Sequence, residues 1–279
     1  MKQTNQRSSS EDSGNLKIAI QKSGRLYEGS MKLLKECGIE VGNGNNQLRV
    51  LSSNFPAEIF FLRDDDIPEY VQDAVADIGM VGENVVMEKN KMVDTVETLG
   101  FGKCRLSIAV PKSGGLESLN DLNDKKIATS YPGILSGYLK QKNISASIHE
   151  ISGSVEIAPR IGLADAICDL VSSGSTLFTN ELKEIETILS SQAVLISNKD
   201  LSTEKKAILE SLMFRIRSVK KARNNKYVLL NAPNEKVEAI SKLLPGMKSP
   251  TVLPLVEPGW SSIHSVIDGT DFWNVIEQL

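Results

Sequence analysis

The segment 165–176, DAICDLVSSGST, combines an acidic residue inside an apolar stretch with a loop of glycine and small hydroxylated residues. Successive backbone N–H groups of such a loop can point into one concavity, and a following helix N-terminus adds partial positive charge. A phosphate monoester suits that concavity, and an acid just before it could accept hydrogen bonds from a sugar diol. The same pattern also fits an ordinary strand-to-helix turn with a Ser or Thr N-cap. The candidate residues are Asp169, Ser172, Ser173, Gly174, Ser175 and Thr176.

Cationic side chains follow two of the predicted strands. Lys22 and Arg25 flank a glycine after the first strand, and Arg63 precedes three aspartates, 64–66. Open α/β sheets bind ligands at the carboxyl ends of their strands, so Lys22 and Arg25 could hold a polyphosphate, the arginine in bidentate fashion. Arg63 could contact a phosphate, and the aspartates could hold Mg²⁺. Each segment alone also fits a solvated loop or a helix start, and for Asp66 we favour the helix start.

Three further residues follow strands and could contact a nucleotide. Glu83 and Asn84 could bind a base or ribose, and Tyr131 could place its ring against a nucleotide. Simple turns account for these positions equally well. His149 and His264 are the only histidines, and we expect each to be structural or on the surface, so the sequence nominates no catalytic histidine.

Short strands alternate with helices from residue 16 onward, which favours parallel pairing with helices on the sheet faces. A second series begins near Cys104, and the apolar segment 193–197 would return the chain to the first sheet. The sequence thus predicts two α/β lobes with two crossings, and a cleft between such lobes is a natural ligand site. The predicted strands are 16–20, 48–52, 58–63, 77–81, 105–110, 126–129, 148–151, 166–171 and 193–197. The predicted helices are 27–37, 66–75, 83–89, 134–141, 154–163 and a stretch after Thr176.

The C-terminal part of the chain has a different order of predicted helices and strands. Residues 203–223 form the clearest predicted helix, because apolar residues recur there at steps of three and four. The order that follows is β-α-β-β-α, whereas a ferredoxin-like unit is β-α-β-β-α-β. We therefore expect an α+β domain of ferredoxin-like type that lacks its last strand. Its predicted elements are 227–230, 235–244, 251–256, 261–266 and 271–279.

The composition is that of an ordinary globular protein, with 41% hydrophobic and 24% charged residues among 279. Lys and Arg total 32 against 35 Asp and Glu, and the net charge of −3 argues against a nucleic-acid partner. The three cysteines are scattered, as in a reducing compartment. No apolar run approaches the ~18 residues of a membrane span, and the polar segment 1–14 lacks a secretory signal. We expect a cytoplasmic protein with no membrane partner and a mobile N-terminal tail.

Several motifs, taken together, resemble those of ATP phosphoribosyltransferase of the long form, the first enzyme of histidine biosynthesis. The resemblance extends from about residue 16 to the end of the chain, and the block 153–177 is its most specific part. The motifs are QKSGRL at 21–26, RDDDIP at 63–68, FGKCRLS at 101–107, IATSYP at 127–132, GSVEIAPRIGLADAICDLVSSGSTL at 153–177 and SPTVLPL at 249–255.

The resemblance implies two lobes like those of type II periplasmic binding proteins, with the active site between them, and a regulatory ferredoxin-like domain. It implies Mg²⁺, inhibition by histidine, and homodimers that interconvert with homohexamers. The implied reaction is attack of N1 of ATP on C1 of phosphoribosyl pyrophosphate, with release of pyrophosphate. The expected parts are a tail at 1–14, a first lobe at 15–103 with a return segment at 185–203, a second lobe at 104–184, a linking helix at 204–223 and a regulatory domain at 224–279.

The family also implies roles for the candidate residues. The loop 172–176 would bind the 5′-phosphate, and Asp169 would bind the ribose hydroxyls. No catalytic base is required, because N1 already has a lone pair, and the Mg²⁺ ligands are not assigned. If the chain ends naturally at Leu279, we expect weak inhibition by histidine. The residues expected to contact ATP or pyrophosphate are Lys22, Arg25, Arg63, Glu83, Asn84 and Tyr131, and those expected to contact histidine are Thr251 and Asn231, where some members have an acid.

Two other functions remain open from the sequence. A two-lobed ligand-binding or sensor protein without turnover would share the fold, but the apparent absence of a secretory signal argues against a periplasmic binder. A regulatory paralogue without activity would have eroded catalytic motifs, and the loop 172–176 is intact.

Overall fold

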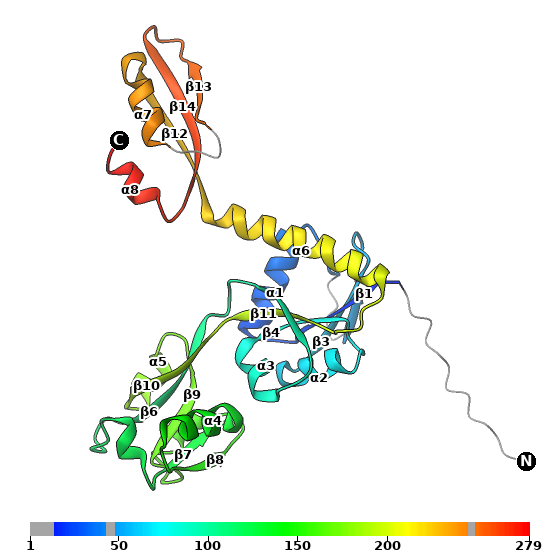
Figure 1. Cartoon of the computed structure of the whole chain (residues 1–279), viewed down its shortest axis with the longest axis vertical. Coiled ribbons are helices and arrows are strands. Elements are labelled where there is room, and N and C mark those ends of the chain that lie inside the picture. Colours follow the sequence, from blue (N-terminus) through cyan, green and yellow to red (C-terminus); the bar gives the residue numbers. More distant parts are fainter. Residues whose placement is uncertain (1–13, 43–47, 245–248) are drawn as a thin grey trace, which may run out of the picture. The chain divides into compact units, whose positions relative to one another are not determined.

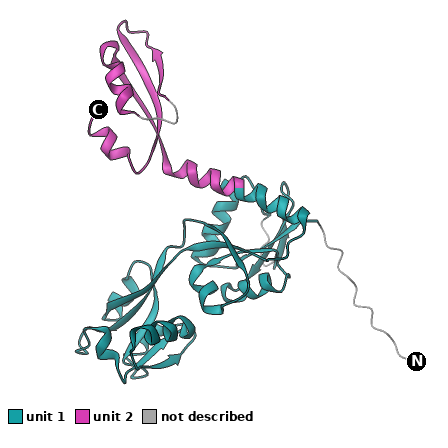
Figure 2. Cartoon of the chain, in the orientation of Figure 1, with its two compact units in different colours: residues 1–213 teal, residues 214–279 magenta. Residues whose placement is uncertain are grey.

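The computed structural model of the chain describes residues 14–42, 48–244 and 249–279 (Figure 1). Contacts separate the chain into two units, residues 1–213 and 214–279 (Figure 2). The boundary falls within the long helix α6, Thr203–Asn224. Among the described residues, the first unit holds two sheets and the second holds one.

The first sheet has the strand order β2-β3-β1-β4-β11-β5. Strand β1 pairs in parallel with β3 and β4, and antiparallel strands complete both edges. Ile18, Ala19 and Ile20 are all fully buried, because helices pack on both faces of this central strand. We call this sheet and its helices the first lobe. Its elements are β1 Leu16–Gln21, α1 Arg25–Glu36, β2 Arg49–Leu51, β3 Ala57–Leu62, α2 Ile67–Gln72, β4 Ile78–Gly82, α3 Glu83–Lys89, β5 Asp94–Thr98 and β11 Ala193–Ser197.

The second sheet has the strand order β10-β6-β9-β7-β8 and forms the second lobe. Leu135 and Leu139 of α4 pack on one face, with Leu106 and Ile108. The other face is covered by α5 and by the short 3₁₀ turn η3. The elements are β6 Cys104–Pro111, η2 Leu119–Leu122, β7 Lys126–Thr129, α4 Pro132–Lys142, β8 Ser147–Glu150, η3 Val155–Ile157, β9 Ala166–Val171, α5 Ser175–Thr179 and β10 Leu182–Ser191.

The chain passes between the two sheets twice, from β5 to β6 and from β10 to β11, which confirms the predicted pair of α/β lobes. The two passing segments lie together, since the Ala193 N–H donates to the Phe101 carbonyl at 2.9 Å and the Leu99 N–H donates to the Ala193 carbonyl at 2.9 Å. The two lobes are therefore connected by two neighbouring segments that are hydrogen-bonded to each other.

The expected position of the return to the first lobe was wrong. Residues 185–191 belong to β10, which pairs antiparallel with β6 in the second sheet. The crossing therefore comes at Gln192, between β10 and β11. Two register shifts, at Glu184/Glu186 and at Thr187/Leu189, interrupt the strict alternation by which a sequence reveals a strand, and β10 was not predicted.

Two other predicted helices are shorter than expected, and one strand was missed. The segment 154–163 forms only the 3₁₀ turn η3, because Ser154 and Gly162 are left-handed (φ 50° and 73°) and Pro159 has no N–H. Helix α2 ends at Gln72 rather than near residue 75, since Ala74 is also left-handed with φ 56°. Strand β5 was not predicted.

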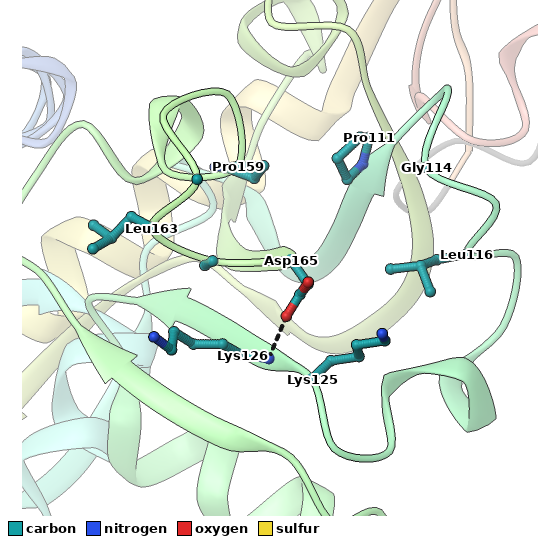
Figure 3. A pocket seen from close by; sticks show the side chains of 10 residues that line it. Pro111, Gly114, Leu116, Lys125, Lys126, Pro159, Leu163 and Asp165 are labelled. Atoms are coloured by element: carbon teal, nitrogen blue, oxygen red, sulfur yellow. Dashed lines mark hydrogen bonds between the residues drawn. The ribbon is translucent and has the colours of Figure 1, made fainter.

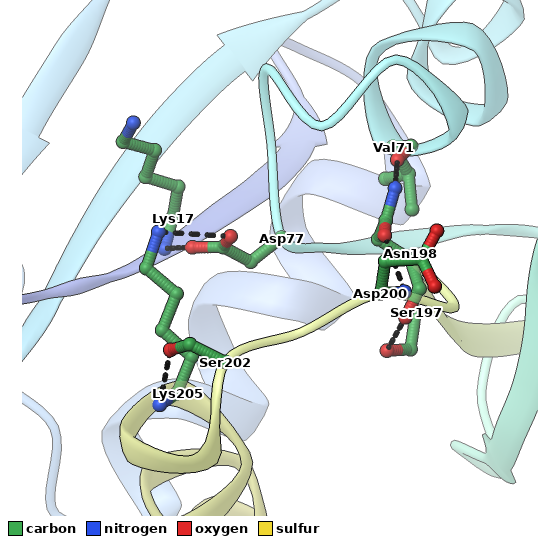
Figure 4. Close-up of polar contacts among 8 residues, drawn as sticks. All are labelled: Lys17, Val71, Asp77, Ser197, Asn198, Asp200, Ser202 and Lys205. Atoms are coloured by element: carbon green, nitrogen blue, oxygen red, sulfur yellow. Dashed lines mark hydrogen bonds and ion pairs between the residues drawn. The ribbon is translucent and has the colours of Figure 1, made fainter. Parts of the chain in front are cut away.

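The start of α6 is fixed to the first lobe by a buried polar cluster (Figure 4). Lys205 Nζ donates to Asp77 Oδ1 at 3.1 Å, and the two side chains are 10% and 6% exposed. The Lys17 backbone N–H donates to the other carboxylate oxygen at 2.8 Å. Asn198 donates its side-chain amide to the Val71 carbonyl at 2.7 Å. Buried charges are tolerated only when paired and hydrogen-bonded, and the Lys205–Asp77 pair joins the first turn of α6 to the first lobe.

The second unit contains a three-stranded antiparallel sheet in the order β12-β14-β13. Its core contains Val228, Ala232, Ile263 and Ile267. The series β12, α7, β13, β14, α8 confirms the predicted β-α-β-β-α order. In the described part of the chain, no helix is long and apolar enough to cross a membrane. The elements are β12 Asn225–Pro233, η4 Asn234–Lys236, α7 Val237–Leu243, β13 Thr251–Pro254, β14 Trp260–Asp268 and α8 Phe272–Ile276.

Candidate active site

The candidate phosphate loop, residues 172–176, connects β9 to α5 and lines a cavity of 470 Å³, which we call the loop cavity. Gly174 is left-handed with φ 81°, and it occupies the N-cap position without a side-chain cap hydrogen bond. The N-cap residue is therefore not a Ser or Thr, although Ser173 Oγ accepts the Ser175 N–H at 3.4 Å. Helix α5 has only 5 residues, so its dipole is small and the loop's own amides and hydroxyls are the main donors available.

Asp169 faces the same cavity from β9, on the strand face that carries Ile167 and Val171. Burial raises the pKa of this carboxyl, and the nearby Glu156 raises it further. The Leu170 N–H donates to Asp169 Oδ1 at 2.8 Å, which opposes the shift. A partly desolvated carboxylate gains most from additional hydrogen-bond donors, and a sugar diol would supply them.

Arg25 reaches the phosphate loop from the other lobe. Its Nη1 donates to Ser172 Oγ at 2.6 Å, and its side chain lines the loop cavity. Arg25 starts α1, so the carboxyl end of β1 in the first lobe and the carboxyl end of β9 in the second lobe meet here. A guanidinium at this position adds a full positive charge to a loop that otherwise offers only neutral donors.

Lys22 and Arg63 lie beside each other at the carboxyl ends of two parallel strands. The Lys22 N–H donates to the Leu62 carbonyl at 2.8 Å, which continues the β1–β3 pairing one residue further. Both side chains are exposed, and neither lines the loop cavity. The structure therefore brings these two predicted cations together with each other but not with the phosphate loop.

A second, smaller cavity of 150 Å³ adjoins the loop cavity and shares Arg25, Leu170 and Ser172 with it. We call it the interlobe cavity. Asp64, Asn84 and Lys103 line it as well. Burial raises the pKa of Asp64, with a further increase from Asp65 beside it. Sequence reasoning did not nominate Lys103, although it lies within the motif 101–107.

Asn84 and Tyr131 are joined across the lobes. Asn84 is 3% exposed, and its side-chain amide donates to the Tyr131 hydroxyl at 3.2 Å. Ser191 Oγ donates to Asn84 Oδ1 at 2.8 Å and accepts the Asn84 N–H at 3.1 Å, so both ends of the amide are used. Burial, and then the negative charge of Asp169, raise the pKa of the Tyr131 phenol, which is therefore neutral at physiological pH. Glu83 is half-buried and lines neither cavity.

The two residues expected to contact histidine share one face of the sheet in the second unit but are not adjacent. Thr251 lies opposite His264 and lines a cavity of 210 Å³ with it, whereas Asn231 lies opposite Ser262 and does not line that cavity. His264 contacts Tyr227 through Nδ1 and Ser262 through Nε2, the latter at 3.0 Å. The sequence predicted that His264 is structural or on the surface, and it did not predict the place of this residue in the cavity.

A further cavity, of 360 Å³, lies at the opposite edge of the second sheet, where β6 ends and β7 and β9 begin (Figure 3). The Asp165 carboxylate at its centre accepts the Lys126 N–H at 2.8 Å. The side chains of Lys125 and Lys126 extend away from each other (Figure 3), so they do not form a single cationic site. This cavity is separate from the candidate active site.

Comparisons with known proteins agree with this arrangement. Residues 63–218 match the family model of ATP phosphoribosyltransferase, and residues 222–279 match the model of the HisG C-terminal domain. The ATP phosphoribosyltransferase of Cytophaga hutchinsonii is 61% identical over 264 residues, which cover 95% of this chain and 92% of that protein. The enzyme of the same name from Bacteroides thetaiotaomicron is 54% identical over 264 residues, covering 95% and 93%.

Solved structures show the same relationship. The ATP phosphoribosyl transferase (HisG:HisZ) complex from Thermotoga maritima matches with a TM-score of 0.65 and 29% identity, covering 75% of this chain and 98% of that one. A substrate-binding protein of an amino acid ABC transporter matches with a TM-score of 0.51 and 14% identity, covering 75% and 94%, which shows the fold alone. This chain belongs to the ATP phosphoribosyltransferase family, the transferases of histidine biosynthesis.

Proposed function

We propose that this transferase moves the 5-phosphoribosyl group of phosphoribosyl pyrophosphate to N1 of ATP, giving phosphoribosyl-ATP and pyrophosphate. One observation carries the proposal: Asp169 and the left-handed loop at Gly174 face one cavity, into which Arg25 reaches from the other lobe. A phosphate bound at the loop and a carboxylate on the strand before it require a hydroxylated spacer between them, and ribose 5-phosphate is such a ligand.

The chemistry requires charge stabilisation more than proton transfer. Positive charge develops on the ribose while negative charge develops on the departing pyrophosphate, so cations near the leaving group stabilise the transition state. Arg25 contributes one such charge, and Lys22 and Arg63 provide a second pair near the ATP phosphates or the leaving group. No base is needed, because N1 of adenine is already a nucleophile. Holding two substrates in line contributes on the order of 7–11 kcal/mol in favourable cases.

The nucleotide would lie toward the interlobe cavity. Tyr131 contributes a neutral aromatic surface, and Asn84 holds that ring through its hydroxyl. Glu83 would contact the nucleotide from the first turn of α3. This assignment leaves the loop cavity for phosphoribosyl pyrophosphate and predicts that the two substrates meet near Arg25 and Ser172.

Mg²⁺ would enter with the phosphates of the substrates. Among the described residues, no group of three or more His, Cys, Asp or Glu side chains could hold a metal ion. Mg²⁺ usually binds one or two carboxylates, several waters and substrate phosphates, and the partly buried Asp64 beside Asp65 fits that role. The ion would neutralise charge on the phosphates and strengthen pyrophosphate as a leaving group.

We further propose that histidine inhibits the enzyme through the second unit, near Thr251 and His264, and that Asn231 contributes from the same sheet face. A cytoplasmic homodimer in exchange with a homohexamer is the assembly we expect. The observation that supports a separate, regulatory role is that residues 214–279 form a compact unit with a core of its own.

The direct test mixes the protein with ATP, phosphoribosyl pyrophosphate and Mg²⁺ and follows pyrophosphate with a coupled pyrophosphatase. We expect release that needs both substrates, and loss of that release in Asp169→Ala. Binding of either substrate without any pyrophosphate release would support a two-lobed binding or sensor protein instead. The same assay with added histidine measures inhibition.

A further inference from the structure

The first turn of α4 is capped by a side chain from the other lobe. Tyr131 occupies the N-cap position and makes no side-chain cap hydrogen bond, and Pro132 has no N–H to donate. The first available donors are the amides of Gly133 and Ile134. They donate to Glu88 Oε1 at 2.8 Å and Glu88 Oε2 at 2.9 Å, so one carboxylate of α3 satisfies both.

Gly133 leaves room for the close approach of Glu88. A Cβ atom on residue 133 would lie 3.0 Å from Glu88 Oε1, which is closer than ordinary van der Waals contact. The carboxylate is also favoured electrostatically, because α4 has 11 residues and its N-terminus carries partial positive charge. Gly133 therefore leaves space for the carboxylate, and the helix dipole favours its negative charge.

Helix α3 makes a second contact with the segment that begins α4. Asn84 lies one turn before Glu88 in α3, and its side chain holds the Tyr131 hydroxyl at 3.2 Å. Helix α3 thus contacts the tyrosine hydroxyl at one turn and the backbone just after this residue at the next. A Ser or Asp at residue 131 could have capped α4 locally, without connecting the lobes. Instead the cap is supplied from 45 residues away in the sequence.

We propose that Glu88 is a positioning residue that holds segment 131–134 of the second lobe against α3 and thereby fixes the Tyr131 ring for ATP. This inference rests on the proposed nucleotide role of Tyr131. Separating the lobes exposes two helix amides and a carboxylate at once, so the contact favours the closed arrangement. Glu88 does not touch the reacting atoms, and its effect is expected on ATP affinity rather than on the chemical step.

The test compares the full-length Glu88→Ala and Glu88→Gln proteins with Glu69→Gln. Glu69 is an exposed carboxylate of α2 in the same lobe, paired with Lys91 at 3.2 Å, and it serves as the charge-matched control. Two measurements are made on each protein: hydrogen exchange of the amides of residues 133 and 134 by NMR, and affinities for ATP and phosphoribosyl pyrophosphate by calorimetry, alongside KM and kcat.

In Glu88→Ala we expect faster exchange at residues 133 and 134 and about tenfold weaker ATP binding, the size expected for a lost helix cap. The affinity for phosphoribosyl pyrophosphate and the value of kcat should each change by less than about twofold. Glu88→Gln retains one acceptor oxygen and should fall between Glu88→Ala and wild type, and Glu69→Gln should match wild type.

Unchanged exchange in Glu88→Ala would overturn the proposed contact. Faster exchange with unchanged ATP affinity, or an equal loss of affinity for both substrates, would reduce Glu88 to a structural cap and also overturn the proposal. If the wild-type protein released no pyrophosphate, the transferase reaction would fail as a proposal. The exchange rates and the ATP affinities would then still decide the role of Glu88.

Discussion

The loop cavity and the interlobe cavity are built in different ways. Most of the loop cavity comes from one continuous stretch, 169–177, with Arg25 and Glu156 added from elsewhere. The interlobe cavity draws on separate segments around Arg25, Asp64, Asn84, Gly102 and Leu170. One site therefore depends on local backbone conformation, whereas the other depends on how the two lobes come together.

This difference has an energetic consequence. A loop whose donors are neighbours in sequence is preorganised by its own dihedral angles, so a single change there disturbs several contacts with the ligand. A cavity assembled from distant side chains distributes its contacts, and a change at one of them leaves the others in place. Substitutions in the loop cavity should therefore cost more activity than those in the interlobe cavity.

The largest effect is expected from Asp169→Ala. Hydrogen bonds to a charged group contribute about 1.5–3 kcal/mol each, so losing a carboxylate that binds a diol should lower kcat/KM for phosphoribosyl pyrophosphate by about a hundredfold or more. Thermal unfolding should change little, since burial already disfavours this carboxylate in the folded protein. Steady-state kinetics with each substrate varied in turn make the measurement.

Asp169→Asn provides the matched control because it keeps the shape and loses the charge. Its activity should lie below wild type and above that of Asp169→Ala. Near-wild-type rates in Asp169→Ala would remove this residue from the site.

A smaller effect is expected from Gly174→Val. The left-handed conformation, φ 81°, costs an L-residue about 1–2 kcal/mol or more, and a β-branched side chain is the least suited to it. The loop should relax to another conformation, and KM for phosphoribosyl pyrophosphate should rise by about ten- to thirtyfold. Affinity for ATP should be almost unchanged.

Gly137→Ala is the control for added bulk. A Cβ would meet nothing within 4 Å at either Gly174 or Gly137, but Gly137 lies inside helix α4 and only Gly174 has a positive φ. The Gly137 variant should keep full activity and gain slightly in stability. Equal effects of the two substitutions would contradict a conformational role for Gly174.

The same contrast governs what could be predicted from sequence. The strands that end at the site, such as β9, were predicted within a residue or so, because strands buried on both faces are short, mostly apolar runs. The phosphate loop was predicted as a unit, since its glycine and hydroxyl residues are contiguous. The left-handed conformation at Gly174 is visible only in the structure.

The interlobe contacts could not be predicted in this way. Nothing in the local sequence of Glu88 indicates that it caps a helix in the other lobe, and Lys103 has no pattern of its own. Arg25 was predicted to bind the phosphates of ATP or pyrophosphate, but its contact with Ser172 joins residues 147 apart in the sequence. Strand β10 was missed for a related reason, because its two register shifts break the alternation on which strand prediction depends.

A pH effect of intermediate size should separate the two cavities. Burial and Glu156 raise the pKa of Asp169, so in the free enzyme this carboxylate takes up a proton at higher pH than an ordinary aspartate. The ionised form binds the diol, and kcat/KM for phosphoribosyl pyrophosphate should therefore fall as the pH drops through that raised pKa, by about tenfold per pH unit below it. The profile of kcat/KM against pH measures this limb.

Asp169→Asn should remove the limb, since its amide does not titrate in this range. A limb that persists in Asp169→Asn would assign the titration to another group, such as Asp64, whose pKa burial also raises.

The smallest effect is expected from Tyr131→Phe, whose hydroxyl is held by Asn84 of the interlobe cavity. The substitution removes the hydroxyl that accepts from Asn84 at 3.2 Å and keeps the aromatic ring. A neutral hydrogen bond contributes about 0.5–1.5 kcal/mol, so affinity for ATP should fall by only about three- to tenfold, and affinity for phosphoribosyl pyrophosphate should not change. Tyr131→Ala removes the ring as well and should weaken ATP binding further, because an aromatic contact is lost with the hydrogen bond. If Tyr131→Phe cost as much as Asp169→Ala, ATP binding across the lobes would depend on one contact rather than several. The contrast between a locally encoded site and an assembled one would then fail.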